Sequence, residues 1–218
     1  MAQSTTEEDY LKAIYKLSRT KPKEVSTKSI SNVLNVKSPT VSDMLRKLGN
    51  KKLIKYAKYQ GVTLTSEGEK IALKIIRKHR LWETFLAEQL KFKWDEVHDI
   101  AEQLEHIHSP ELVDRLDEYL GFPKFDPHGD PIPDKDGTIS IRHDKTLDQV
   151  QIGQNAIIVG VKDHSADFLK FVESISLTLG TQLKVTNVID YDKSLVVKIG
   201  NSSERSLSNQ VCKNLFVK

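Results

Sequence analysis

The sequence predicts a mainly helical protein with a smaller amount of β-structure, arranged in three consecutive segments. Apolar residues recur with helical spacing over most of the first 120 residues, whereas the last third contains short runs rich in Val and Ile. The charge also changes along the chain: residues 1–65 carry a net +8, residues 66–138 a net −7 and residues 139–218 a net +2. We expect domains with these boundaries, the first suited to a polyanion and the second to cations.

Several classes of protein are disfavoured by simple counts. A single cysteine, Cys212, excludes an intramolecular disulfide and a Cys-based zinc cluster. No apolar run approaches the roughly 20 residues of a membrane span, and the N-terminus lacks a basic-then-apolar export signal. We therefore expect a cytoplasmic protein that does not contact the membrane.

The first segment is predicted to form three short helices. The first covers about residues 6–19, after a capping-box pattern, and residues 21–23 end it. Ser26 can cap the second helix, and a turn at residues 35–37 follows it. Ser38 as N-cap and Pro39 at the first helical position open the third helix, which ends at residues 49–50.

Two strands follow, at residues 53–56 and 62–65, joined across residues 58–61. Helices separated by a tight turn and then a hairpin are typical of a winged helix-turn-helix, in which the third helix would enter the major groove of DNA. A small helical domain with a solvated basic face is the alternative. The side chains expected at the DNA are Lys37, Ser38, Pro39, Thr40, Ser42, Asp43, Arg46 and Lys47.

The acidic segment is predicted to be helical, and the last segment to form a small β-barrel. Helices are expected from Ser66 to about residue 90, over residues 94–108, and after the Ser109 cap as far as Gly121. A Pro- and Gly-rich linker covers residues 122–137. The barrel strands are expected at residues 156–162, 182–190 and 194–200, with a helix at 165–178.

Four of the seven histidines lie between residues 79 and 108. His79 and Glu83 are one helical turn apart, and a second stripe on the next helix combines His and Glu residues, namely His98, Glu102, Glu105 and His106. Such pairs also arise by chance in a chain with 29% charged residues. Two sets on consecutive helices nevertheless indicate a metal site.

The donor types indicate the metal. Imidazole and carboxylate without thiolate suit Mn²⁺ or Fe²⁺, while Zn²⁺, Co²⁺ or Ni²⁺ could compete in vitro. A metal-dependent hydrolase or a storage protein could use the same residues. However, the sequence contains no nucleophile–base arrangement, phosphate loop or HExxH pattern, so we do not expect an enzyme.

Several runs resemble the diphtheria toxin repressor family of metal-dependent transcriptional regulators. They are TTEEDYLKAIYKL, SPTVSDMLRKL, LTSEGEKIA with RKHRLWETFL, VHDIAEQLEHIHSPELVDRLDEYLGFP and DPHGDPIP. The tail is similar to the SH3-like, FeoA-like domain of longer members. The resemblance implies a homodimeric repressor that binds palindromic operator DNA when Mn²⁺ or Fe²⁺ is present and controls genes of metal-ion uptake. A winged-helix regulator of a non-metal effector stays open as the alternative.

The resemblance also implies the metal ligands. One site would combine Asp9 with Glu102, Glu105 and His106, and the other would use His79, Glu83 and His98. Iron-type members have Met and Cys where this chain has Asp9 and Glu102, so the resemblance favours manganese. The first site would then bridge the DNA-binding domain to the dimerisation domain.

This chain departs from the short manganese regulators at Lys12. Those proteins have a carboxylate there that helps to hold a second, paired metal ion, so we expect separate sites instead. Longer members complete the second site from the linker and barrel, which here implies Asp126, His128 and Asp163. His164 and Asp167 compete for the barrel contribution, and a solvated turn is the alternative reading of the linker residues.

Overall fold

A computed structural model describes residues 3–20, 25–57, 61–140, 145–200 and 203–218. The expected helix break at residues 21–23 and most of the expected hairpin turn lie outside these residues. The chain divides into two compact units. The first comprises Met1–His79, Leu104–His108 and Pro133–Thr138, and the second comprises Arg80–Gln103, Ser109–Ile132 and Ile139–Lys218.

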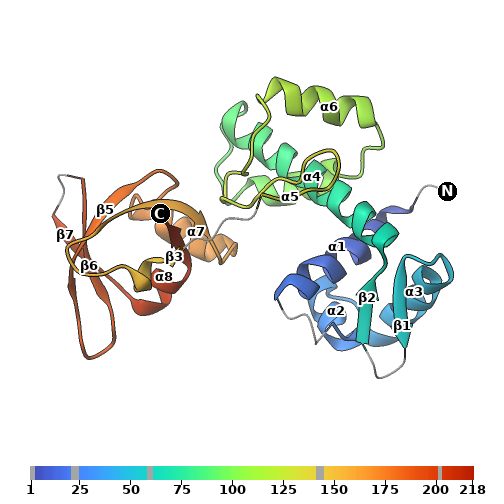
Figure 1. Cartoon of the computed structure of the whole chain (residues 1–218), viewed down its shortest axis with the longest axis horizontal. Helices are drawn as coiled ribbons and strands as arrows, with labels where there is room; N and C mark the ends of the chain where they lie inside the picture. Colours follow the sequence, from blue (N-terminus) through green and yellow to red (C-terminus); the bar gives the residue numbers. More distant parts are fainter. Residues whose placement is uncertain (1–2, 21–24, 58–60, 141–144, 201–202) are drawn as a thin grey trace. The chain divides into compact units, whose positions relative to one another are not determined.

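The first unit begins with the predicted helix-turn-helix and wing (Figure 1). Its elements are α1 (Thr5–Thr20), α2 (Thr27–Leu34), α3 (Ser38–Asn50), β1 (Ile54–Ala57), β2 (Gly61–Leu64) and the first part of α4 (Ser66–Glu88). Strands β1 and β2 form an antiparallel hairpin in which Ile54 faces Leu64. The order of elements confirms the predicted winged helix-turn-helix fold.

Local sequence explains the ends of these helices. Ser26 accepts a hydrogen bond from the Ser29 backbone N–H and completes a capping box. Asn35, with φ of 51°, ends α2 in the left-handed conformation that Asn tolerates. The expected N-cap of α3 was wrong by one residue: Lys37 occupies this position without a side-chain hydrogen bond, and Ser38 is already helical.

The core of the first unit fixes which face of α3 is exposed. Val41, Leu45 and Leu48 are fully buried at helical spacing, and so are Leu11 and Ile14 of α1. Burying such aliphatic side chains contributes about 1.5–3 kcal/mol each. The opposite face of α3 therefore stays at the surface.

The helical part of the second unit contains the rest of α4, α5 (Val97–Leu104) and α6 (Pro110–Tyr119). Helix α5 is shorter at both ends than the predicted helix over residues 94–108. Ser109 caps α6 as predicted, by accepting a hydrogen bond from the Leu112 backbone N–H. No described helix is both long and apolar enough to cross a membrane.

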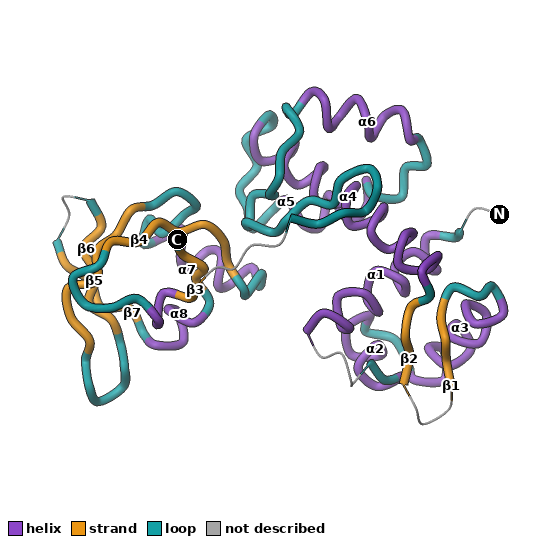
Figure 2. The backbone as a smooth tube through the Cα atoms, in the orientation of Figure 1, coloured by secondary structure: helices purple, strands orange, loops and turns teal. Residues whose placement is uncertain are grey.

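The C-terminal part of the second unit is an antiparallel sheet with three short helical segments (Figure 2). Its strands are β3 (Lys145–Thr146), β4 (Asn155–Val161), β5 (Gln182–Val188), β6 (Leu195–Ile199), β7 (Glu204–Leu207) and β8 (Leu215–Val217). The helical segments are η1 (Leu147–Gln149), α7 (Ala166–Ser174) and α8 (Asn209–Lys213). Strands β3, β7 and β8 are additions to the predicted set.

The order of the strands corrects the expectation of a closed barrel. It runs β3-β8-β4-β5-β6-β7, so β3 and β7 are edges of an open sheet in the described part of the chain. An apolar core nevertheless forms inside this curved sheet, with Ile158, Val185 and Val197 fully buried. The SH3-like character is therefore that of a partly open sheet around one core.

Candidate metal centres

The first candidate centre lies in the first unit, where His106 meets the first turns of α1. His106 Nδ1 lies 2.8 Å from Glu8 Oε2, and its Nε2 lies 3.1 Å from Asp9 Oδ1. Donor atoms of Asp9, Glu105 and His106 all lie within 4.8 Å of one another. Three residues of the predicted first site are thus brought together, and they join α1 to the segment Leu104–His108.

Glu105 is the most deeply buried member of this cluster. Its side chain is fully buried, and its two oxygens have different partners: Lys12 Nζ lies 2.6 Å from Oε1, and His79 Nδ1 lies 2.6 Å from Oε2. A buried carboxylate needs such partners because removing it from water is costly. Lys12 therefore supplies a fixed positive charge inside the centre.

The second candidate centre lies in the second unit. Donor atoms of Glu83, Asp126 and His128 all lie within 4.8 Å of one another, and all three residues are buried. His128 Nε2 lies 2.7 Å from the Trp94 carbonyl oxygen, so the N–H belongs on Nε2. Nδ1 lies 3.8 Å from Glu83 Oε2, and it carries the lone pair once the imidazole is neutral. This is the tautomer that a metal-binding histidine needs.

The second centre has a strongly perturbed electrostatic environment. Burial, together with the nearby Glu83 and Asp130 carboxylates, raises the pKa of Asp126 to about 7 against the opposing charge of Arg80. Burial would lower the pKa of His128, but the contact with Glu83 outweighs it and raises the pKa to about 9. Buried carboxylates that repel one another are typical of a site for a cation.

A loop held by a glycine positions Asp126 and His128. Gly129 has φ of +85°, and a Cβ at this position would meet the Val159 carbonyl oxygen at 2.2 Å. The Val161 backbone N–H donates to the His128 carbonyl oxygen. The linker can therefore lie against β4 only because residue 129 has no side chain.

The remaining predicted ligands lie around these two centres. His98 Nδ1 lies 3.2 Å from Glu83 Oε1, and its Nε2 lies 3.5 Å from Glu102 Oε1. His79 is one turn before Glu83 on α4, and its described hydrogen bond is to Glu105. Glu102 is in α5, one helical turn before His106 in the sequence.

The contribution of the barrel differs from expectation. Asp163 Oδ1 accepts a hydrogen bond from the Ser165 backbone N–H, and among the described residues Asp163 belongs to no group of candidate ligands. His164 instead stacks on His128, with ring centroids 5.2 Å apart. No group of candidate metal ligands among the described residues includes His164, so His164 packs against a candidate ligand without adding another. Asp167 lies in the first turn of α7 and is likewise absent from the groups.

Sequence reasoning missed Glu8, although it adjoins Asp9 and contacts His106. The available signal was the run Glu7-Glu8-Asp9, because three consecutive acidic residues point three ways around a helix, 100° apart. Which of them faces His106 depends on packing between segments about 100 residues apart in the sequence. The pattern alone could not decide it.

The donor chemistry of both centres fits a divalent ion. Carboxylate oxygens and imidazole nitrogens converge at each centre, and the chain's single thiol, Cys212, is buried in the C-terminal core. Burial raises the pKa of Cys212 to about 11, so it remains a thiol. Oxygen and nitrogen donors of this kind suit Mn²⁺ and Fe²⁺.

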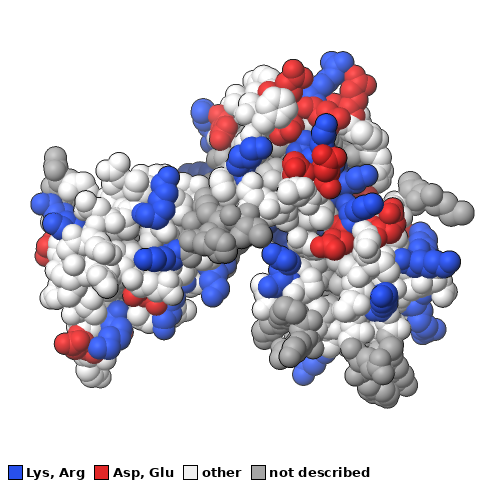
Figure 3. All heavy atoms as spheres, viewed as in Figure 1, with Lys and Arg blue, Asp and Glu red and all other residues white. Residues whose placement is uncertain are grey.

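The predicted DNA-contacting residues lie on the outer face of α3. Seven of the eight are exposed and Ser42 is half-buried. Two of them, Asp43 and Arg46, form an ion pair with each other. On the face drawn in Figure 3, Lys and Arg side chains are distributed over the helix-turn-helix and wing.

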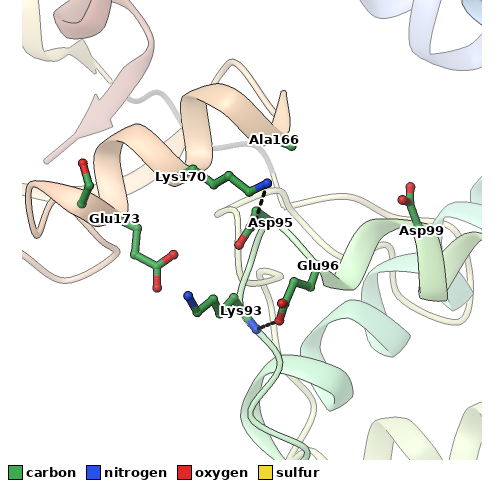
Figure 4. Close-up of a pocket in the computed structure, with 8 residues that line it drawn as sticks. Lys93, Asp95, Glu96, Asp99, Ala166, Lys170 and Glu173 are labelled. Carbon is green, nitrogen blue, oxygen red and sulfur yellow. Dashed lines mark hydrogen bonds and ion pairs between the residues drawn. The ribbon is translucent and has the colours of Figure 1, made fainter.

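A separate hollow of about 750 Å³ lies in the second unit, between the start of α5 and α7 (Figure 4). Asp95 lines it with a side chain that is 6% exposed, and its Oδ2 lies 3.8 Å from Lys170 Nζ. Glu96 and Glu173 also line it, but no group of candidate metal ligands among the described residues includes them. The hollow has mixed charge and is distinct from both centres.

Comparison with known proteins identifies the family to which this architecture belongs. The N-terminal DNA-binding domain of iron-dependent repressors matches residues 3–62, their metal-binding and dimerisation domain matches residues 65–134, and the FeoA domain matches residues 145–218. A solved manganese-dependent transcriptional repressor, in complex with manganese, is 35% identical, with a TM-score of 0.84 over 97% of this chain and 98% of that one. The chain belongs to the diphtheria toxin repressor family of metal-dependent repressors.

Curated relatives carry names of the same kind. The iron-dependent repressor IdeR of Mycobacterium bovis is 34% identical over 128 residues, which are 59% of this chain and 55% of that protein. The diphtheria toxin repressor of Corynebacterium jeikeium is 26% identical over 193 residues, which are 88% of this chain and 78% of that protein. The match thus spans just over half the length of the first of these relatives. Family members are repressors by name rather than enzymes, in agreement with the sequence-based expectation.

Proposed function

We propose that this chain is a metal-dependent transcriptional repressor that binds double-stranded operator DNA as a homodimer, in the cytoplasm, when Mn²⁺ or Fe²⁺ is available. Its targets would be genes of metal-ion uptake. Three domains, at residues 1–65, 66–138 and 139–218, would divide the work of DNA binding, metal binding with dimerisation, and support of the second centre.

One observation carries this proposal: His106 contacts both Glu8 and Asp9 of α1, at 2.8 and 3.1 Å. Glu7 of α1 forms ion pairs with Lys47 and Lys51 at the end of α3, so a change at this centre can act on the DNA-binding module. A divalent ion would supply the positive charge that lets these carboxylates lie close together. Metal and DNA would then strengthen each other's binding by the same factor.

We assign the ligands as follows. Asp9, Glu105 and His106 would hold one ion, with Glu102 as the fourth ligand because it lies one turn earlier in the chain. Glu83, Asp126 and His128 would hold the other, and its remaining ligand candidates are His79, His98 and Asp163. The converging donor atoms of each centre and the orienting hydrogen bond of His128 support this assignment.

The position of Lys12 indicates that the first centre holds one ion and not two. Its ammonium lies 2.6 Å from Glu105 Oε1 and already neutralises charge beside that carboxylate. A second ion there would meet a tethered cation at short range. We therefore expect two metal ions per chain, one at each centre.

Exposed apolar residues support the homodimer. Leu112 and Tyr119 are 37% and 65% exposed, and they lie seven residues apart on one face of α6. Phe122, which lies three residues beyond the end of this helix, is 58% exposed. Large apolar side chains left at the surface mark an association face, and this face belongs to the segment that matches the dimerisation domain.

Fluorescence anisotropy tests the proposal. Full-length protein is titrated onto a labelled fragment from its own upstream region at constant salt, with Mn²⁺, anaerobic Fe²⁺ or Zn²⁺, and then treated with chelator. We expect binding with Mn²⁺ or Fe²⁺ that chelator reverses. Tight binding that persists in chelator would favour a non-metal effector and contradict the proposal.

A further inference from the structure

Glu7 connects α1 to the last turn of α3. Its carboxylate is buried, with a side chain 1% exposed, and Lys51 Nζ lies 2.7 Å and Lys47 Nζ 3.1 Å from Oε1. Glu7 also accepts a hydrogen bond from the Ser4 backbone N–H at 3.1 Å, which fixes it at the start of α1. A buried anion with two lysine partners holds these two helix ends together.

The same turn of α1 carries residues of the first metal centre. Glu8 and Asp9 follow Glu7 directly, and both contact His106. Successive helical residues differ in direction by 100°, so this turn presents Glu7 to α3 and the next two residues to the metal centre. A rotation or shift of the turn would therefore move both sets of contacts together.

The two lysines are partners of different accessibility. Lys47 has a side chain 54% exposed, and that of Lys51 is 32% exposed. Both lie at the C-terminal end of α3, where their ammonium groups could instead contact DNA phosphates. The position of Glu7 thus determines where the end of α3 lies and how much positive charge it offers to DNA.

We propose that Glu7 is the positioning residue that couples the first metal centre to the recognition helix, through its ion pairs with Lys47 and Lys51. This inference rests on the proposed function. In this role Glu7 contacts neither the metal nor the DNA. Its effect is on the ratio between DNA affinity with metal and DNA affinity without it.

Glu7→Gln tests this role, because the substitution keeps the shape of the side chain and removes its charge. The matched control is Glu67→Gln, at an exposed acidic residue in the first turn of α4. Operator affinity is measured in saturating Mn²⁺ and in chelator, and Mn²⁺ affinity is measured without DNA. We expect Glu7→Gln to lower the metal-to-chelator affinity ratio at least fivefold, while its Mn²⁺ affinity without DNA and the ratio of the control change less than twofold.

Lys51→Gln provides a second route, because a partly exposed lysine can be replaced with little risk to folding. It should lower the same ratio, and the double variant Glu7→Gln/Lys51→Gln should lower it no further than Glu7→Gln alone. A wild-type ratio in folded Glu7→Gln and Lys51→Gln would overturn the role of Glu7 alone. A ratio of one already in the wild-type protein would overturn the proposed function and this inference with it.

Discussion

Lys12 Nζ lies 2.6 Å from Glu105 Oε1, and the two side chains are 7% and 0% exposed. The pair thus places a covalently attached cation among carboxylates that are candidate metal ligands. Removing one partner of a buried ion pair costs about 3–5 kcal/mol, because the other is left buried and unpaired. The lysine should therefore matter both for stability without metal and for the number of ions bound.

The first prediction concerns Lys12→Glu. A carboxylate in place of the ammonium adds a ligand and removes the competing cation, so we expect one additional Mn²⁺ per chain by equilibrium dialysis. Without metal, this variant should unfold at a lower temperature than the wild type, and Mn²⁺ should restore much of the loss. Lys12→Met serves as the control, since it removes the charge without adding a ligand. Unchanged stoichiometry in Lys12→Glu would contradict the role of Lys12 in limiting the first centre to one ion.

A second prediction concerns metal preference at Glu102. Replacing this carboxylate by a thiolate, in Glu102→Cys, would introduce a soft ligand into the proposed first centre and should shift activation of DNA binding from Mn²⁺ towards Zn²⁺ and Cd²⁺. The measurement is the order of metals in a DNA-binding titration. The same order of metals as in the wild type would remove Glu102 from the ligand set.

Gly129 gives a third prediction, for the second centre. Gly129→Ala forces a Cβ into the Val159 carbonyl oxygen and also strains a backbone with φ of +85°. This close contact should displace the loop with Asp126 and His128, so we expect about tenfold weaker Mn²⁺ binding at one of the two sites, a loss of about 1.4 kcal/mol.

The matched control is Gly153→Ala, which has φ of +87° but no atom within 4 Å of the added Cβ. Isothermal titration calorimetry with Mn²⁺ distinguishes the two variants. If both behave alike, backbone strain rather than the close approach to β4 explains the effect.

The fourth prediction is a pH dependence. Burial would raise the pKa of Glu7, but its hydrogen bonds with Lys51, Ser4 and Lys47 lower it from 4.5 to about 2. Because the folded-state pKa is below the unfolded value, Glu7 stabilises the fold fully above pH 4.5, and this contribution is lost as the pH falls towards 2. The difference in unfolding temperature between the wild type and Glu7→Gln should therefore be constant near neutral pH and shrink in acid. A difference in unfolding temperature that does not depend on pH would contradict the stabilising role of the Glu7 charge.

Much of the fold was predictable because local signals and apolar spacing agree. The Ser26 and Ser109 caps, and the burial of Leu45 and Leu48, follow from patterns a few residues long. The ends of α5 and the strands β7 and β8 did not follow. Short strands near the C-terminus are defined by pairing with distant partners, and such pairing leaves little trace in the local sequence.

Part of each candidate cluster was predictable from the sequence, but its full membership and detail were not. Helical spacing indicates that His98 and Glu102 can meet, and they do, at 3.5 Å. The contact of Glu8 with His106 and the stacking of His164 on His128 depend on how separate segments pack. A single sequence carries no record of such packing, so these features came from the structure.

In the proposed mechanism, a metal ion held by Asp9 and its neighbours controls DNA binding. The most direct measurement is operator affinity of the wild type, Asp9→Ala and Glu102→Ala, each with saturating Mn²⁺ and with chelator, alongside their dimer content by analytical ultracentrifugation. Asp99→Ala, at an exposed residue of α5, is the control. We predict that Asp9→Ala and Glu102→Ala remain dimers but lose the metal-stimulated affinity, whereas the control keeps it. A wild-type response to Mn²⁺ in both ligand variants would contradict the account.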